Sequence, residues 1–174
     1  GRTRGRARPA IGAWGGGDCT QAEAKCCLRD GRGVGFGADD VVWPSHSGGI
    51  IRNNVCDRSA SQPGDVGNIL SDSPRTQVLN NTVLISGTYS SPIEIRYPGT
   101  TGGLIVNNLL DGGIGVRDGA TATQRSNYLG ANASMFVNAA AGDLHLTASA
   151  IGALDQGEGV ATVTNDGDAE LRPR

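Results

Sequence analysis

The chain contains very little lysine and few aromatic side chains. Of its 174 residues only Lys25 is a lysine, aromatic residues make up 4%, and there are two Phe and one Met. Large aromatic side chains anchor most broad hydrophobic cores, so this composition excludes a core of that kind. Glycine is abundant, at 28 residues. A narrow core of stacked Ile, Val and Leu fits such a chain.

Long apolar runs and a strong charge of one sign are missing too. No stretch approaches the roughly 20 apolar residues that cross a bilayer, so we predict no membrane span. The formal net charge is −2, which argues against a nucleic-acid partner. The exception is a run of alternating arginines near the N-terminus, which could grip phosphates or belong to a disordered segment. It consists of Arg2, Arg4, Arg6 and Arg8.

The four cysteines lack the spacing of a zinc site. Cys19, Cys26, Cys27 and Cys56 contain no paired C-x-x-C units, and no histidine lies near them in the sequence. Disulfides that tie down the N-terminal segment and buried thiols both remain open. The N-terminus has no apolar signal-peptide region. If the protein is secreted, its signal is expected upstream of Gly1.

An internal repeat dominates the middle of the chain. Two apolar residues, Asn-Asn and a further apolar stretch recur in Ile50–Val55, Val78–Val83 and Ile105–Leu110, with a degraded copy at Gln124–Leu129. The second Asn moves from Asn54 to Asn81 to Asn108 in equal steps, and Asn127 follows after a shorter one. A repeat of this length that contains short strands and no helical pattern is typical of one coil of a β-solenoid.

The repeated asparagines have two interpretations. Asn tolerates left-handed backbone angles at a bend, so the pairs could mark ordinary surface turns. Alternatively, coils stacked about 4.8 Å apart bring equivalent amides within bonding distance. Because apolar residues flank each pair, we predict a hydrogen-bonded ladder of Asn54, Asn81, Asn108 and Asn127.

Further strand-like segments separate the repeats and define the domain organisation. They are Val66–Leu70, Ile93–Arg96 and Ile114–Arg117, each followed by a turn signal. Residues 33–37 could be the same strand of an earlier coil. We therefore predict a poorly specified N-terminal segment over 1–32, about four coils over 33–130, and an irregular C-terminal cap over 131–174. In the cap, strands are expected at 135–138 and 143–146, with Phe136 closing the core.

The coil and cap motifs resemble the pectin-lyase-like superfamily, in the group of secreted bacterial right-handed parallel β-helix proteins. The resemblance covers roughly residues 33–174. It rests on the three Asn-Asn coils and on a closing phrase: Phe136–Asn138, Gly142–Leu146, Ser149–Ala153, Asn165–Asp168 and Arg172–Pro173. The chain departs from the phrase by lacking the usual Pro before Ala150 and by having Gly152 where Asp is common. The resemblance implies an all-β, right-handed parallel β-helix that is secreted and that binds or cleaves polysaccharides, often acidic ones.

A complete catalytic set is not evident. The lyases that the chain resembles use a Lys and Arg pair on adjacent coils to remove a proton and stabilise the anion, but Lys25 lies outside the repeat. Glycosidases need two or three converging carboxylates, and the adjacent Asp39 and Asp40 lack the family's surrounding signatures. Whether the chain is an enzyme stays open, with catalytic coils expected upstream if it is one.

Strand alternation gives the best candidate for a binding site. If Ile93 and Ile95 point inward, Glu94 and Arg96 point outward, as does Arg117 one coil later. Arg96 and Arg117 would then stand one above the other and could grip a uronate or sulfate. The remaining candidates of this site are Tyr97, which could stack on a sugar ring, and Asp118. In the alternative interpretation, both arginines are solvated and partly neutralised by Glu94 and Asp118.

No cofactor or metal is predicted. Asn165–Asp168 has oxygen ligands in the style of a calcium loop, but it lacks the full spacing and fits a turn. His46 and His145 lie far apart in the sequence, and neither places a nucleophile. Three functional hypotheses follow: the end of a polysaccharide-active enzyme, a non-catalytic carbohydrate-binding β-helix, or a structural, surface-adhesion solenoid.

Overall fold

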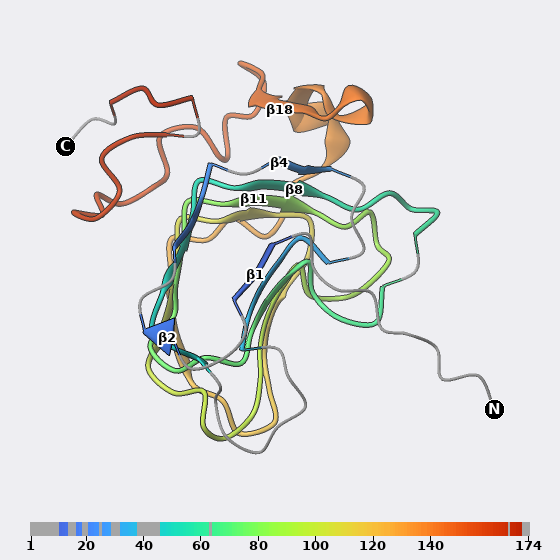
Figure 1. The fold of residues 1–174 in the computed structure, drawn as a ribbon. Coiled ribbons are helices and arrows are strands. Elements are labelled where there is room, and N and C mark those ends of the chain that lie inside the picture. The colour runs from blue at the N-terminus through green and yellow to red at the C-terminus, as the bar shows by residue number, and fades with distance from the viewer. Residues whose placement is uncertain are drawn as a thin grey trace.

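The regular secondary structure of the described part of the chain consists almost wholly of short parallel strands. The computed structural model describes residues 11–13, 17–18, 21–24, 26–28, 32–37, 46–62, 64–166 and 168–171. Figure 1 looks along the stack, so that successive coils lie nearly on top of one another. The chain is therefore all-β with almost no helix, and its parallel sheets are consistent with a β-solenoid.

Three parallel sheets form the walls of the stack. Sheet 1 contains β1 (Ile11–Ala13), β5 (Val34–Phe36), β9 (Ile69–Ser71), β12 (Ile93–Ile95) and β15 (Ile114–Val116). Sheet 2 contains β3 (Gln21–Glu23), β7 (Ile50–Arg52), β10 (Gln77–Leu79), β13 (Gly103–Val106) and β16 (Ala122–Arg125). Sheet 3 contains β4 (Cys26–Leu28), β8 (Val55–Asp57), β11 (Thr82–Leu84) and β14 (Leu109–Leu110). A smaller parallel pair joins β2 (Gly17–Asp18) to β6 (His46–Ser47).

The register follows the repeat seen in the sequence. Ile51 pairs with Val78 and Val78 with Ile105, whereas the last step pairs Ile105 with Gln124. Stacked asparagines are accordingly 27 residues apart twice and then 19 apart. The strand predicted at residues 33–37 is confirmed as β5, which pairs with β9.

Strands also occur inside the segment 1–32, where the sequence shows no repeat. β3 pairs with β7, and β4 pairs with β8. Ala22 lies in register with Ile51, and Cys27 with Cys56, so small side chains hold the positions that larger apolar residues take later. Cys27 and Cys56 are both buried in the core. The stack thus begins earlier than residue 33, because the strand positions persist where the Asn-Asn motif is absent.

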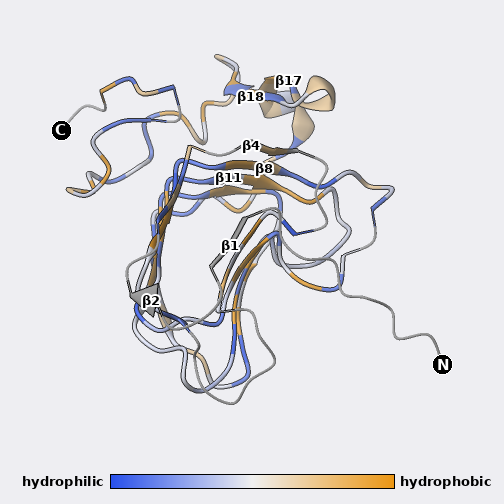
Figure 2. Cartoon of the chain, in the orientation of Figure 1, coloured by the Kyte–Doolittle hydropathy of each residue, from blue (hydrophilic) through white to orange (hydrophobic). Residues whose placement is uncertain are grey.

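The interior of the stack is a narrow column of aliphatic side chains. Each coil contributes one or two residues from each sheet, and these pack on the equivalent residues of the next coil. Figure 2 shows hydrophobic residues along the stacked strands and hydrophilic residues in the turns between them. The buried residues of this core are Ala22, Cys27, Val34, Phe36, Ile51, Cys56, Ile69, Val78, Val83, Ile85, Ile93, Ile95, Ile105 and Leu110.

The second asparagine of each pair forms a continuous ladder. Asn54 donates both its backbone N–H and its Nδ2 to Asn81 Oδ1, at 3.1 and 2.8 Å. Asn81 donates in the same way to Asn108 Oδ1, at 3.0 and 2.9 Å. Asn108 then donates to Asn127 Oδ1, also at 3.0 and 2.9 Å. These bonds satisfy amides that are almost fully buried, which would otherwise cost about 1–3 kcal/mol each.

The first asparagine of each pair turns the chain. Asn53, Asn80 and Asn107 have φ values of 55, 54 and 59°, and Ser126 takes the same place in the last coil with φ 50°. This is the left-handed region, which Asn adopts at lower cost than most residues. Each Asn-Asn pair therefore divides two tasks: the first residue makes the corner and the second bonds the coils together.

The cap packs on the outer side of sheet 3, not on the end of the stack. Two short 3-10 helices, η1 (Ala133–Met135) and η2 (Ala139–Ala141), accompany an antiparallel pair, β17 (Phe136–Asn138) and β18 (Asp143–Leu146). Figure 1 shows this unit beside β4, β8 and β11. The two predicted cap strands are confirmed. The prediction that Phe136 closes the narrow core is wrong, because Phe136 packs with Leu84 and Leu109, which face outward from sheet 3.

Residues 156–166, called the strap here, run back along the outer side of sheet 2. Asn107 binds the backbone of Glu158 twice, accepting from its N–H at 2.9 Å and donating to its carbonyl at 2.7 Å. Asn53 donates to the Asn165 carbonyl at 2.8 Å. Val163 packs against Leu79 and Val106. The corner asparagines thus hold the strap across several coils.

No helix among the described residues is long and apolar enough to span a membrane.

Candidate functional site

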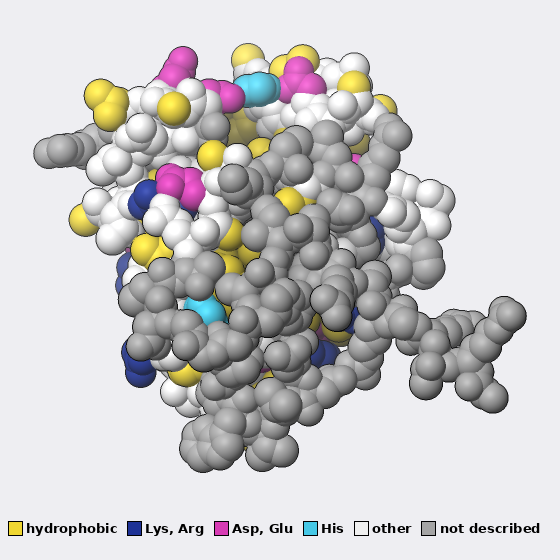
Figure 3. All heavy atoms as spheres, viewed as in Figure 1, with side chains coloured by type: hydrophobic (Ala, Val, Ile, Leu, Met, Phe, Trp, Pro, Cys, Tyr) yellow, Lys and Arg dark blue, Asp and Glu magenta, His cyan; other side chains and the backbone are white. Residues whose placement is uncertain are grey.

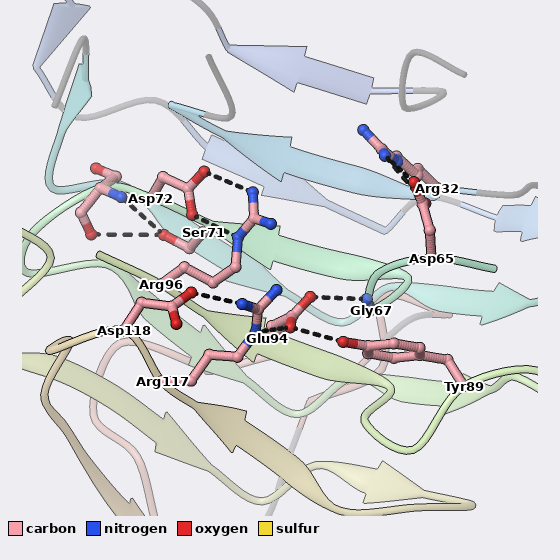
Figure 4. Close-up of polar contacts among 11 residues, drawn as sticks. Arg32, Asp65, Gly67, Ser71, Asp72, Tyr89, Glu94, Arg96, Arg117 and Asp118 are labelled. Atoms are coloured by element: carbon pink, nitrogen blue, oxygen red, sulfur yellow. Dashed lines mark hydrogen bonds and ion pairs between the residues drawn. The ribbon is translucent and has the colours of Figure 1, made fainter. Parts of the chain in front are cut away.

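The candidate site lies where the strands of sheet 1 end. Ser71 pairs with Ile95 and Ile95 with Val116, so the next residues, Asp72, Arg96 and Arg117, follow one another across three coils. Figure 4 shows these side chains on the outer side of the sheet, together with Glu94 and Asp118. The inward neighbours Ile93 and Ile95 belong to the core, so strand alternation sends the charged residues to the other face.

Arg96 is held by Asp72 from the preceding coil. Its Nε and Nη2 donate to Asp72 Oδ1 and Oδ2 at 3.4 and 3.2 Å, in the two-pronged geometry that suits a guanidinium and a carboxylate. The two side chains are only 11% and 4% exposed. The guanidinium carbon also lies 4.8 Å from the centre of the Tyr97 ring, within the range of a cation–π contact. Arg96 is therefore fixed in place rather than solvated.

Glu94 lies beneath the charged surface. Its Oε1 accepts from Tyr89 Oη at 3.1 Å and from Arg117 Nε at 2.5 Å, and its Oε2 accepts from the Gly67 N–H at 3.2 Å. The sequence predicts an outward Glu94, and strand alternation in the structure gives it that direction. The side chain is nevertheless only 1% exposed, because neighbouring residues cover it.

Glycines on both neighbouring coils make room for that carboxylate. A Cβ on Gly67 would lie 2.8 Å from the Ser91 carbonyl and 3.1 Å from Glu94 Cβ. A Cβ on Gly115 would lie 3.0 Å from Ser91 Oγ and 3.5 Å from Glu94 Cγ. Because Gly67 and Gly115 leave this space, the Glu94 side chain can lie flat against the sheet and accept hydrogen bonds from both sides.

Arg117 and Asp118 form the exposed edge of the site. Arg117 bridges the buried Glu94 and Asp118, and its Nη1 donates to Asp118 Oδ2 at 2.5 Å. The side chains of Arg117 and Asp118 are 41% and 43% exposed. Tyr97 and Asp118 both adopt left-handed backbone angles, with φ 72 and 56°. The pairing of Arg117 with Glu94 and Asp118 has the neutralised character of the alternative interpretation of the sequence.

Carboxylates outnumber guanidinium groups in this cluster, and this affects their protonation. Burial raises the pKa of Asp72 to about 6, and the nearby charge of Glu94 adds to the increase, while the hydrogen bond from Arg96 opposes it. Burial also raises the pKa of Tyr89, with Glu94 contributing. The net charge of the site therefore becomes less negative when the pH falls towards 6.

Each guanidinium has a terminal nitrogen outside the hydrogen bonds to Asp72, Glu94 and Asp118. Arg96 uses Nε and Nη2, which leaves Nη1, and Arg117 uses Nε and Nη1, which leaves Nη2. The hydrogen bonds already made prevent the side chains from turning away. Two positioned cationic donors beside an aromatic ring can bind a carboxylate or sulfate on a sugar.

The structure places Glu94, Arg96, Tyr97, Arg117 and Asp118 near one another, and it adds residues that sequence reasoning misses. Asp72, Tyr89 and Gly67 complete the cluster, and Arg32 forms an ion pair with Asp65 nearby, at 3.0 Å. Asp72 could have been found from the sequence, because it is the first residue after β9, just as Arg96 is the first residue after β12. Tyr89 lies in a turn between strands, where the repeat gives no register.

The other sequence candidates do not form a site in the described residues. Lys25, Asp39, Asp40 and the N-terminal arginines lie outside them. Asp166 Oδ1 accepts from the backbone N–H groups of Asp168 and Glu170, as in a turn. No group of three or more His, Cys, Asp or Glu side chains able to hold a metal occurs in the described part of the chain.

The two histidines each have a local partner. His46 is buried, and its Nδ1 lies 2.9 Å from Ser73 Oγ. His145 is exposed and lies between two aspartates, with Nδ1 2.6 Å from Asp143 and Nε2 3.0 Å from Asp168. Figure 3 shows a histidine between acidic side chains on the surface of the cap.

Comparison with known proteins gives no match to a protein-family model, to a curated protein or to a solved structure. The candidate function therefore rests on the geometry of the chain itself.

Proposed function

We propose that this chain is part of a secreted, right-handed parallel β-helix of the pectin-lyase-like kind, which binds acidic polysaccharide across the outer face of sheet 1. The right-handed sense of the proposed β-helix is supported by a general rule. Connections between parallel strands of one sheet are right-handed in about 98% of cases. The coil and closing motifs quoted above support the family and, with it, secretion.

One observation carries the proposed activity: Arg96 and Arg117 stand on adjacent coils beside Tyr97, each with one Nη outside these hydrogen bonds. Their carboxylate partners lower the cost of ordering both side chains when a ligand binds. A uronate on one sugar unit would accept from Arg117, and the neighbouring unit would contact Arg96 and the Tyr97 ring. Because carboxylates are in excess, we expect moderate affinity that weakens with salt.

The proposal is for binding and does not include a cleavage step. The lysine that would complete a lyase pair is present in the chain only as Lys25. Any processing activity would use residues of a longer protein. Incubating the full-length parent with polygalacturonate and following the absorbance of unsaturated uronate tests that role separately.

The binding experiment compares matched arginine variants. Polygalacturonate and neutral dextran are titrated into the wild type, Arg117→Ala and Arg125→Ala, with circular dichroism to verify folding. Arg125 lies on sheet 2, is 52% exposed and forms an ion pair with Glu158. Its substitution therefore controls for the loss of one surface charge. We expect binding of polygalacturonate only, lost in Arg117→Ala and retained in Arg125→Ala. Equal losses in both variants would overturn the proposed site.

A structural or surface-adhesion solenoid is the second candidate function. It is favoured by the burial of Asp72 and Glu94, whose carboxylates are all engaged by neighbouring coils. Such contacts stabilise the stack whether or not a ligand is present. Failure of the wild type to bind either polymer would support this role over carbohydrate binding.

A further inference from the structure

The last strand of sheet 2 presents an open edge. β16 pairs with β13 on one side, and no described strand pairs with it on the other. The N–H groups of Gly103 and Asn107 donate to the carbonyls of Thr121 and Arg125. Because bonding groups alternate along a strand, Thr123 and Arg125 face β13, whereas Ala122 and Gln124 direct their N–H and C=O groups outward.

The same end of the stack exposes residues that every earlier coil covers. Gln124 lies in register beneath Ile105, Val78 and Ile51, which are all fully buried, yet it is exposed. Leu129 in the last coil is 48% exposed. The cap does not cover this end, because its apolar side chains pack on the outer face of sheet 3.

We propose that two copies of this chain pair through β16, as antiparallel strands related by a two-fold axis at Thr123. This register places Ala122 opposite Gln124 of the second copy, so that each pair exchanges two hydrogen bonds between outward-facing groups. Thr123 meets its own counterpart at a site without backbone hydrogen bonds. A closed two-fold pair also covers the β16 edge of each copy, which otherwise invites further association.

Self-complementarity identifies a second copy as the partner. In this register Arg125, the one charged residue of β16, faces Thr121 and not its own counterpart, so no like charges are directly opposed. Opposed threonines at the axis are a favourable cross-strand pair. A neighbouring coil end of the same cross-section also covers Gln124 and Leu129, which a single added peptide strand would leave exposed.

The test uses proline to remove one outward donor from the edge strand. Sedimentation velocity over a concentration series compares the wild type with Gln124→Pro and Gln124→Ala. Proline is tolerated on an edge strand where its missing N–H faced outward. We expect a wild-type dimer, dimer affinity reduced about tenfold or more in Gln124→Pro, and near wild-type association in Gln124→Ala, which keeps the N–H. A monomeric wild type, or equal behaviour of the two variants, overturns the proposal.

A cross-link tests the register even if the proline variant misfolds. Opposed residues of the type proposed for Thr123 have Cα atoms about 4.5 Å apart, within the range for a disulfide. Thr123→Cys should therefore give a covalent dimer under mild oxidation beyond the wild-type background. Arg125→Cys places the two thiols on opposite sides of the axis and should not. Equal cross-linking of both variants contradicts the register.

Discussion

The guanidinium of Arg117, 41% exposed, donates at 2.5 Å to the carboxylate of Glu94, which is 1% exposed and lies one coil away. A surface cation thus stabilises a buried anion, in a pair that links β12 and β15. Losing one member of such a pair has unequal consequences, because a buried charge without a partner costs far more than an exposed one.

Arg117→Ala should therefore destabilise the protein by about 2 kcal/mol, less than for a fully buried pair because Arg117 is partly solvated. The loss leaves Glu94 with neutral donors only, Tyr89 and the Gly67 N–H. Urea unfolding measures the change. Asp118→Ala serves as the control and should cost less than about 0.5 kcal/mol, since Asp118 is exposed. Equal costs would contradict the role of Glu94.

The position of an asparagine in the ladder should determine its importance. Asn81→Ala removes the oxygen that accepts from the Asn54 N–H and Nδ2, and the Nδ2 that donates to Asn108 Oδ1 and to the Ile51 carbonyl. Only the backbone N–H bond to Asn108 is kept. We expect a loss of about 3 kcal/mol in the free energy of unfolding. Asn127→Ala, at the partly exposed end, should cost less than half as much. A similar loss in the two variants would argue against a cooperative ladder.

Asp72 should make stability depend on pH in a distinctive direction. Its folded pKa of about 6 exceeds the ordinary aspartate value of about 3.9, so the folded protein binds a proton more tightly than the unfolded chain. This contribution is complete below about pH 4 and is lost as the pH rises through about 6. Relative to Asp72→Asn, the wild type should lose about 1–3 kcal/mol across this window. Chemical denaturation at several pH values measures the difference, and a flat difference contradicts the assignment.

How far the sequence predicts this protein depends on whether a residue belongs to the repeat. The steps between Asn54, Asn81, Asn108 and Asn127 give the register of sheets 2 and 3, and strand alternation separates Ile93 and Ile95 from Glu94. Alternation does not reveal that Glu94 is covered, because the cover comes from Tyr89 in an irregular turn and from space left at Gly67. Nor does it place Phe136, since an apolar cap strand fits the side of the stack as well as its end.

The strap gives a prediction with a close control. Asn107→Gly removes the two hydrogen bonds to the Glu158 backbone while permitting the left-handed angle. The Glu158 amide should then exchange with solvent about tenfold faster or more. Asn80→Gly makes the same change one coil earlier, where Asn80 Oδ1 is buried with no hydrogen-bond partner. Asn80→Gly should leave hydrogen exchange of the Glu158 amide unchanged. Equal acceleration in both variants would mean that the backbone conformation at the corner residues, and not the side-chain hydrogen bonds of Asn107, holds the strap.

His145 should titrate above its ordinary range. Hydrogen bonds to Asp143 and then to Asp168 raise the pKa of His145. The protonated form therefore links the cap to the last described residues, and this contribution is present at low pH and lost as the pH rises through the raised pKa. An NMR titration should give a value above about 6.5, which falls in Asp143→Asn. An unchanged value in that variant would exclude Asp143 as the cause.

The sideways attachment of the cap bears on how such a chain can change in length. The cap grips Leu84 and Leu109 from the flank and leaves the axis of the coils untouched. Insertion of one 27-residue unit N-terminal to the coils that contain Leu84 and Leu109 would add a coil while leaving these two cap contacts in place. The stack of coils can therefore lengthen by whole 27-residue units, and the charged face along sheet 1 would lengthen with it.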